Sequence, residues 1–256
     1  MDAVTFCVVS RNDNDIIGNC LNSIAEQNYP KQLVDVVVVD RESSDGSAEI
    51  IDNYSKRLRM KIVRQKCTRG AGRNIAAKNA KGKYIAIVEP LAILDRYWLA
   101  NAAKVLSNKS SEGVISTPVP AGVRGILAYA SHFVAGPAEA VIYPKKLYEK
   151  LGGHAEIKWA EEMEMHNKIK ASGKKISYSD NVRHTRGRTN NLSAFISHHF
   201  NRGYAYAKLP KKGMKVSDIS GGERSFITSA AVVFLKGVKS FAGTLGYVYA
   251  TLGGKL

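Results

Sequence analysis

Apolar positions follow two different periods over the first hundred residues of the chain. Continuous apolar runs at 4–10 (VTFCVVS) and 34–40 (VDVVVVD) predict two buried strands, because β-branched runs of this kind are typical of strands covered on both faces. Between these runs, apolar residues recur with the spacing of one helical face and predict a helix. They are Ile16, Ile17, Cys20, Leu21 and Ile24.

The alternation of strand and helix patterns continues to residue 88. A second helix is predicted to begin at Ser44 or Ser47, and its apolar positions are Ile50, Ile51, Tyr54 and Leu58. Three more elements follow: a short strand at 61–64 (KIVR), a small helix at 70–82 (GAGRNIAAKNAKG) ending in Gly82, and a strand at 84–88 (YIAIV). Strands and helices in alternation predict a mostly parallel α/β sheet.

Polar segments follow each predicted strand. They are SRND at 10–13, DRESSD at 40–45, TRGAGRN at 68–74 and EP at 89–90. Because ligands of such sheets bind beyond the carboxyl ends of the strands, these segments predict a nucleotide-sized site at that edge. The glycine-rich piece is not a dinucleotide fingerprint, since Ile75 stands where the third glycine belongs, and the chain has no P-loop.

The pattern is weaker in the second half of the chain. Residues 139–151 predict a helix or a strand, and residues 160–172 predict a helix closed by Gly173. A basic linker at 208–215 precedes an apolar stretch at 226–252 that contains two lysines and three glycines. A spanning helix needs about twenty nearly uncharged residues. We therefore expect an interfacial helix or helical hairpin here, with a helix pair packed on the domain as the alternative.

Charge narrows the classes of partner. The chain of 256 residues has 38 Lys and Arg against 22 Asp and Glu, a formal charge of +16, which favours polyanionic partners such as nucleotides or phospholipid headgroups. Nucleic acid is not the expected partner, because the sequence has no recognisable binding module or aromatic cluster. The three scattered cysteines, Cys7, Cys20 and Cys67, predict reduced thiols in the cytoplasm, and the first two predict core positions. The N-terminus predicts a first strand rather than a signal peptide.

The order and content of these segments resemble the family-2 glycosyltransferases, inverting enzymes of the GT-A fold. VVVVDRESSDGS resembles the family's VVDDGSTDGT, and GAGRNIAAKNAKGKYIAIVEPLAILDRYWL resembles its GxxxARNxGxxxAxGEYIxFLDxDDxLxPxWL. The segments SIAEQNYP, AEEMEMHNKIKASGKKI and VRHTRGRT also have family counterparts. The resemblance implies a GT-A-like three-layer sandwich at 1–207, with a nucleotide-binding half at 1–106 and an acceptor half at 107–207. The basic linker and helical tail at 208–256 would follow.

The resemblance also implies roles for individual residues. The nucleotide-binding residues would be Ser10, Asn12, Asp13, Asp40, Arg73 and Glu89, with Arg73 on the base or the diphosphate. Asp40 has a second reading as a strand-end cap. Glu162 would be the catalytic general base that deprotonates the acceptor hydroxyl, with Glu161 as the neighbouring candidate. Taken alone, these glutamates also fit an acidic helix start.

The family's metal-binding DxD motif is incomplete. Glu89 and Leu91 occupy the two acidic positions, and Ala92 fills the next acidic place. His184 matches the late histidine that can complete the metal shell, although a surface histidine in a basic loop is the alternative. Glu89 and His184 would form a sparse site for Mg²⁺ or Mn²⁺, since hard cations favour several oxygens. The nucleotide diphosphate could supply the missing ligands, arginines such as Arg73 could replace the metal, or the protein could bind without turnover.

The expected activity is therefore transfer of a sugar, with inversion, from a UDP- or GDP-linked donor to an acceptor hydroxyl or a lipid phosphate. The basic composition fits a lipid-linked acceptor and an anionic membrane surface, so we expect a peripheral protein on the inner face of the cell membrane. The non-enzyme alternative is a catalytically silent sugar-nucleotide binder or partner subunit, favoured by Leu91 and Ala92. A nucleotidyltransferase ranks low, since no glycine-rich loop follows the first strand.

Overall fold

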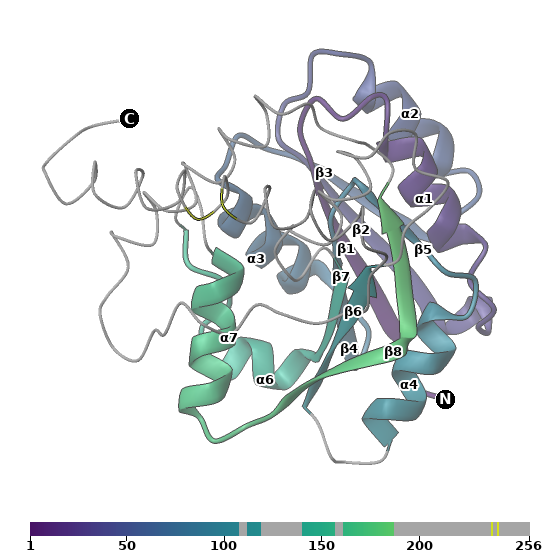
Figure 1. Ribbon diagram of the computed structural model, residues 1–256. Coiled ribbons are helices and arrows are strands. Elements are labelled where there is room, and N and C mark those ends of the chain that lie inside the picture. The colour runs from purple at the N-terminus through teal and green to yellow at the C-terminus, as the bar shows by residue number, and fades with distance from the viewer. Residues whose placement is uncertain (108–111, 119–139, 157–160, 187–236, 238–239, 241–256) are drawn as a thin grey trace, which may run out of the picture. The chain divides into compact units, whose positions relative to one another are not determined.

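The computed structural model describes residues 1–107, 112–118, 140–156 and 161–186, together with residues 237 and 240 (Figure 1). The chain divides into two compact units, and the first comprises Met1–Val119, Ala138–Ile157 and Glu161–Gly187. All elements below belong to this first unit. The linker and tail predicted at 208–256 lie outside the described residues, apart from Gly237 and Ser240, so they stay predictions.

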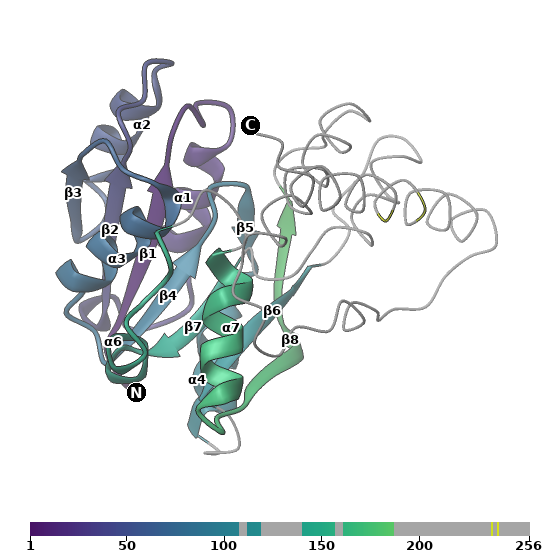
Figure 2. The same ribbon diagram turned by 90° about the vertical axis from the view of Figure 1, so that its left-hand side faces the viewer.

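Eight strands of the described residues form one sheet, in the order β3-β2-β1-β4-β7-β6-β8-β5 (Figures 1 and 2). The first four strands are parallel, as predicted, and β7 is antiparallel to both of its neighbours. β6 and β8 are parallel, and β5 lies antiparallel to β8 at the edge. The bounds are β1 Val4–Ser10, β2 Val34–Asp40, β3 Met60–Arg64, β4 Tyr84–Val88, β5 Ala92–Leu94, β6 Gly113–Pro118, β7 Ala140–Pro144 and β8 Ile176–Arg186.

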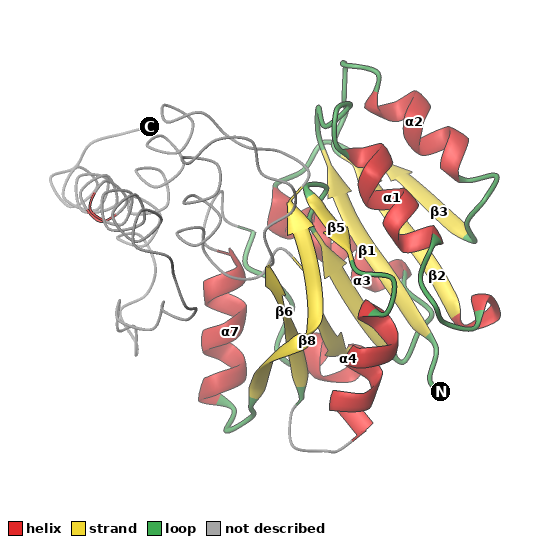
Figure 3. Ribbon diagram, turned by 45° about the vertical axis from the view of Figure 1, so that its right-hand side comes forward, coloured by secondary structure: helices red, strands yellow, loops and turns green. Residues whose placement is uncertain are grey.

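Helices cover both faces of this sheet (Figure 3). On one face lie α1 (Ile17–Ala25), α2 (Ser47–Tyr54) and α4 (Trp98–Ser107), whose apolar side chains join one hydrophobic cluster. On the other face lie α3 (Arg69–Asn79), α6 (Lys145–Lys150) and α7 (Glu161–Ala171), which contribute to a second cluster. The three-layer α/β architecture predicted for a GT-A-like domain is therefore confirmed.

The uninterrupted apolar run of β2 is explained by these two layers. Val36 and Val38 point into the first cluster, while Val37 and Val39 point into the second, because successive side chains of a strand face opposite sides. Both faces of β2 are buried at these positions, so neither set of side chains is polar. Cys7 and Cys20 are likewise fully buried, which confirms their predicted core positions.

Several predicted boundaries shift. The second helix ends at Tyr54, whose carbonyl accepts from the amides of both Arg57 and Leu58 at 3.0 Å, so the chain turns there although Leu58 still packs on the core. The small helix begins at Arg69 and ends at Asn79, three residues before Gly82. A Cβ on Gly82 would lie 2.6 Å from the Thr5 nitrogen, so glycine serves a close backbone approach rather than a helix end.

The elements from β7 to α7 agree with the sequence patterns. The segment 139–151, predicted as helix or strand, contains both: β7 and then α6. The helix predicted at 160–172 is α7, and Gly173 follows it with φ +72°, the left-handed conformation typical of a helix end.

Candidate active site

The loops that follow β1 and β2 interlock. Ser10 and Asp40 are partners in the parallel register, so both loops leave the sheet at the same edge. Asn12 adopts φ +56°, its amide donates to Ser43 Oγ at 3.0 Å, and its Oδ1 accepts from the Ser44 amide at 2.9 Å. The polar segments predicted to converge at the carboxyl ends of these strands therefore do so.

Asp13 lies at the inner side of this pair of loops. Its Oδ2 accepts from Ser10 Oγ and from the Arg11 amide, each at 2.9 Å, and its own amide donates to Ser47 Oγ at 2.8 Å. Burial raises the pKa of the Asp13 carboxyl, and the nearby charge of Glu89 raises it further. Asp13 is thus electrostatically coupled to Glu89, which follows β4.

Asp40 acts as a cap in this structure. Its Oδ1 accepts from the amide and the hydroxyl of Ser43, at 3.0 and 2.6 Å, and its Oδ2 lies 3.9 Å from Arg64 Nε. The side chain is 2% exposed. These contacts agree with the alternative in which Asp40 caps the end of β2. A contact between Asp40 and a nucleoside stays a prediction.

A cluster of two arginines and three glutamates lies beside these loops, and we call it the charged cluster: Arg69, Arg73, Glu89, Glu161 and Glu162. Thr68 caps α3 by accepting from the Ala71 amide at 3.1 Å, and this start of the helix presents Arg69 and Arg73 on one face at i, i+4 spacing. Glu89 follows β4, and Glu161 and Glu162 form the first turn of α7.

Arg73 is at the centre of the charged cluster and is 1% exposed. Its Nη2 contacts Glu89 Oε1 and lies 2.7 Å from Glu162 Oε1, while its Nη1 lies 3.3 Å from Glu161 Oε1. Arg69 is farther from its partners: its Nη1 is 3.8 Å from Glu89 Oε2, and its Nε is 3.8 Å from Glu161 Oε1. One buried guanidinium thus joins the end of β4 to the start of α7.

The pKa values of the two adjacent glutamates are shifted in opposite directions. Burial disfavours the charge of Glu162, but the attraction of Arg73 outweighs it and lowers the pKa to about 2. Burial and the neighbouring charge of Glu162 raise the pKa of Glu161 to about 7. Glu162 is also the more accessible of the two, with 24% of its side chain exposed against 1% for Glu161.

Packing of α3 against residues 148–155 supports the charged cluster. A Cβ on Gly70 would lie 2.0 Å from the Ala155 carbonyl oxygen, so the segment leading into α7 passes directly over the first turn of α3. Asn74 Nδ2 donates to the His154 carbonyl at 2.9 Å, and Asn74 Oδ1 accepts from Tyr148 Oη at 2.7 Å.

Arg69, Gly70 and Asn74 were not assigned roles from sequence. The signal for Arg69 was its i, i+4 spacing from Arg73, which becomes visible once the helix is placed to begin at residue 69. No local pattern pointed to the contacts of Asn74, because its partners His154 and Tyr148 are 80 and 74 positions away.

The described residues do not fit a resident divalent metal. Leu91 is partly buried and Ala92 is fully buried in the first hydrophobic cluster, so neither supplies a ligand. His184 is on β8 rather than in a surface loop; it is 1% exposed, and its Nδ1 lies 2.7 Å from Ser116 Oγ. Within the described part of the chain, no group of three or more His, Cys, Asp or Glu side chains is arranged to hold a metal ion.

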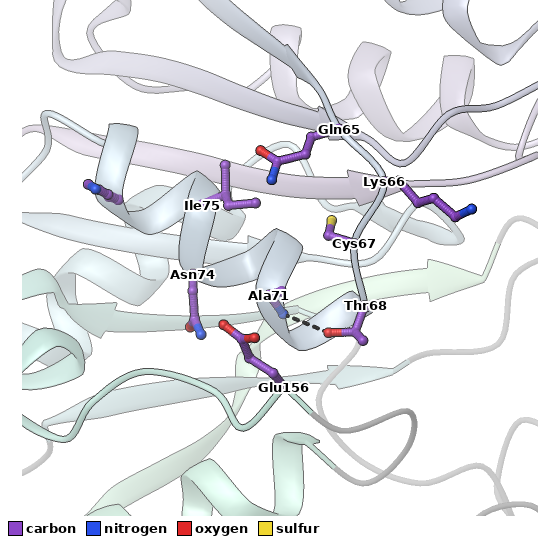
Figure 4. Close-up of a pocket in the computed structure, with 9 residues that line it drawn as sticks. Gln65, Lys66, Cys67, Thr68, Ala71, Asn74, Ile75 and Glu156 are labelled. Carbon is purple, nitrogen blue, oxygen red and sulfur yellow. Dashed lines mark hydrogen bonds between the residues drawn. The ribbon is translucent and has the colours of Figure 1, made fainter.

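A pocket of about 450 Å³ lies on the other side of α3 (Figure 4). Its helical residues Ala71, Asn74, Ile75 and Lys78 occupy the face opposite Arg69 and Arg73, given about 100° per residue. The remaining lining residues are Gln65, Lys66, Cys67, Thr68 and Glu156. This pocket is therefore distinct from the charged cluster.

The carboxyl ends of the parallel strands, beyond which open α/β sheets bind their ligands, thus lie beside the interlocked polar loops and the charged cluster. The family model for glycosyl transferase family 2 matches residues 5–152, and the chain belongs to this family. Among curated relatives, the poly(ribitol-phosphate) beta-N-acetylglucosaminyltransferase TarS of Staphylococcus aureus is 29% identical over 122 residues, 46% of this chain and 21% of TarS. The poly(ribitol-phosphate) beta-glucosyltransferase of Bacillus spizizenii is 37% identical over 82 residues, 30% of this chain and 13% of that protein.

Solved structures show the same fold. A mannosyltransferase from Pyrobaculum calidifontis, PcManGT, in complex with GDP-Man and Mn²⁺, has a TM-score of 0.68 at 20% identity, covering all of this chain and 76% of that one. Residues 1–349 of S. aureus TarS with UDP-GlcNAc have a TM-score of 0.64 at 21% identity, covering 99% and 76%. The chain spans about a fifth of TarS and less of the Bacillus relative, so the match covers only part of these enzymes.

Proposed function

We propose that this domain binds a UDP- or GDP-linked sugar at the carboxyl ends of β1, β2 and β4 and transfers the sugar with inversion. The observation that carries the proposal is the charged cluster, in which Arg73 brings Glu89 and Glu162 together at the site edge of a family-2 glycosyltransferase domain. The known complexes with UDP-GlcNAc and GDP-Man support a nucleotide-sugar donor and leave the base open.

Each part of the site has a task in this proposal. The loops containing Ser10, Asn12 and Asp13, together with Asp40, would line the nucleoside. Glu162 would take the proton of the acceptor hydroxyl while that oxygen forms the new bond to the anomeric carbon and the nucleoside diphosphate leaves. Glu162 suits this role better than Glu161, because a base must reach the acceptor and Glu161 is buried.

The acceptor in this proposal carries phosphate and is lipid-linked. The formal charge of +16 favours such an acceptor, and the names of the two curated relatives describe transfer to poly(ribitol-phosphate). The corresponding location is the inner face of the cell membrane. Among the described residues, no helix is long and apolar enough to cross a membrane. Full activity on a neutral, water-soluble sugar would contradict this acceptor assignment.

The transfer assay uses the full chain, a panel of radiolabelled UDP- and GDP-sugars, and lipid-linked acceptors. Glu162→Gln is expected to lower the transfer rate by at least about 100-fold, the usual range for loss of a general base, with donor affinity retained. Glu149→Gln is the matched control, since Glu149 lies on α6 with 53% of its side chain exposed. Equal loss in both variants would contradict the role of Glu162.

The second candidate function is binding of a sugar nucleotide without turnover. Two observations favour it: Leu91 and Ala92 replace acidic residues, and Arg73 makes Glu162 a weak base by lowering its pKa to about 2. Donor binding with no product from any acceptor of the panel is the result expected from this candidate.

A further inference from the structure

Glu89, the acidic residue retained from the DxD motif, already forms ion pairs with two arginines of the protein. Its Oε1 contacts Arg73 Nη2, and its Oε2 lies 3.8 Å from Arg69 Nη1. A cation that used Glu89 as a ligand would compete with two guanidinium groups for the same oxygens. Since Arg73 is 1% exposed, a cation that took Glu89 from it would remove one of the three carboxylates that compensate a buried charge.

Replacement ligands are not in place around Glu89. Mg²⁺ takes six oxygens in an octahedral arrangement, usually from one or two protein carboxylates together with waters and substrate phosphates. Leu91 stands at the second acidic position, and Ala92 is held in the hydrophobic core. His184 is buried within the sheet, where its backbone pairs with Leu94 of β5 and its Nδ1 meets Ser116. Apolar side chains thus occupy two positions that are acidic in the family.

The charged cluster is close to electrical balance without a metal. Arg69 and Arg73 offset Glu89 and Glu162, and Glu161 is partly protonated near neutrality because burial and Glu162 raise its pKa to about 7. Uncompensated carboxylates would repel an approaching diphosphate. Here Arg69 and Arg73 reduce that repulsion without a metal.

Arg69 is the cation of the charged cluster that a ligand can reach. Its side chain is 36% exposed, against 1% for Arg73. A guanidinium group binds phosphate through two parallel hydrogen bonds and keeps its charge at every working pH. Its place in the first turn of α3, beside Glu89, puts this charge at the edge where the donor phosphates belong.

We propose that this domain binds its nucleotide donor without a resident divalent metal, and that Arg69 supplies the positive charge at the donor's phosphates. The proposal rests on the proposed function, since it concerns the same donor site. It departs from the Mn²⁺-containing complex of PcManGT, whose fold this chain shares.

Calorimetric titration of the full chain with UDP and with GDP tests the metal requirement directly. The dissociation constant of the nucleotide that binds is expected to agree within about threefold between EDTA, Mg²⁺ and Mn²⁺, a difference of under 1 kcal/mol. A dissociation constant at least about tenfold larger in EDTA than in Mn²⁺ would overturn the proposal.

Arginine variants test the second half of the proposal. Arg69→Gln is expected to weaken nucleotide binding in EDTA by at least about tenfold, the usual effect of losing a hydrogen bond to a charged group, and Arg69→Lys by less. Arg57→Gln is the matched control, because Arg57 has the same charge and lies on the surface with 55% of its side chain exposed. Circular dichroism checks that each variant is folded. Equal affinities for wild type and a folded Arg69→Gln would overturn the role of Arg69.

Manganese binding in the absence of nucleotide separates this proposal from the proposed function. Titration of the protein with Mn²⁺, followed by electron paramagnetic resonance, is expected to show no site tighter than about 1 mM. A tighter site that is lost in Glu89→Gln would overturn the metal-free reading even if nucleotide binds. If neither UDP nor GDP binds in any buffer, the proposed function fails and the role of Arg69 fails with it.

Discussion

Replacement of Arg73 by methionine tests the energetics of the charged cluster. Methionine fills a similar volume without charge, so Arg73→Met leaves Glu89, Glu161 and Glu162 with Arg69 as the remaining arginine of the charged cluster. Removal of one partner from a buried ion pair costs about 3–5 kcal/mol. We therefore expect the free energy of unfolding to fall by about that amount at pH 8, a large part of the stability of an ordinary domain.

The loss should depend on pH, and the sign follows from the glutamates. In the wild type, the lowered pKa of Glu162 stabilises the fold above the unfolded value of about 4.5, and this stability is lost as the pH falls through about 2. The raised pKa of Glu161 acts in reverse: its contribution is complete below about 4.5 and is lost as the pH rises through about 7. Without Arg73, Glu162 loses the attraction that lowers its pKa and is left with burial, which raises it as in Glu161, so the variant should lose stability as the pH rises from 5 to 8.

Urea unfolding at pH 5 and pH 8, followed by circular dichroism, measures both quantities. Arg57→Met serves as the control and should change stability by no more than about 1 kcal/mol, as for an exposed ion pair. A loss below about 1 kcal/mol for Arg73→Met, or an equal loss at both pH values, would refute the view that Arg73 neutralises a buried set of carboxylates.

Three further experiments have defined expected outcomes. Gly70→Ala should destabilise the protein by about 1–3 kcal/mol through the clash with the Ala155 carbonyl, whereas Gly18→Ala, whose nearest neighbour would be 3.6 Å away, should be neutral or slightly stabilising in urea unfolding. Glu161→Gln should flatten the decrease of stability between pH 4.5 and 7, and an unchanged slope in pH-dependent unfolding would contradict its raised pKa. A thiol reagent should label Cys67 in the native state and the two buried cysteines only after unfolding, as mass spectrometry can show.

The elements of the first hundred residues could be predicted because local pattern and topology agree there. The β-branched run at 34–40 is apolar throughout since both of its faces are covered, and Ile17, Leu21 and Ile24 form a helical face beside it. Parallel strands joined by helices then bring the segments that follow them to one edge, so the meeting of the 10–13 and 40–45 loops followed from order along the chain.

The charged cluster could not be predicted from the sequence, because it depends on contacts between residues that are far apart along the chain. Arg73 and Glu162 are 89 positions apart, and no local period shows that α7 begins beside the first turn of α3. The different burial of Glu161 and Glu162 likewise follows from how α7 is seated. Composition around His184 suggested a basic loop, yet pairing of β8 with β5 and β6 buries that histidine in the sheet.

A structure of the full chain crystallised with UDP or GDP tests the central claim most directly. The nucleotide should lie over the carboxyl ends of β1 and β2, with its phosphates beside Arg69 and Glu89. A nucleotide bound instead in the pocket between Cys67 and Glu156, on the opposite side of α3, would contradict the assignment of the charged cluster as the donor site.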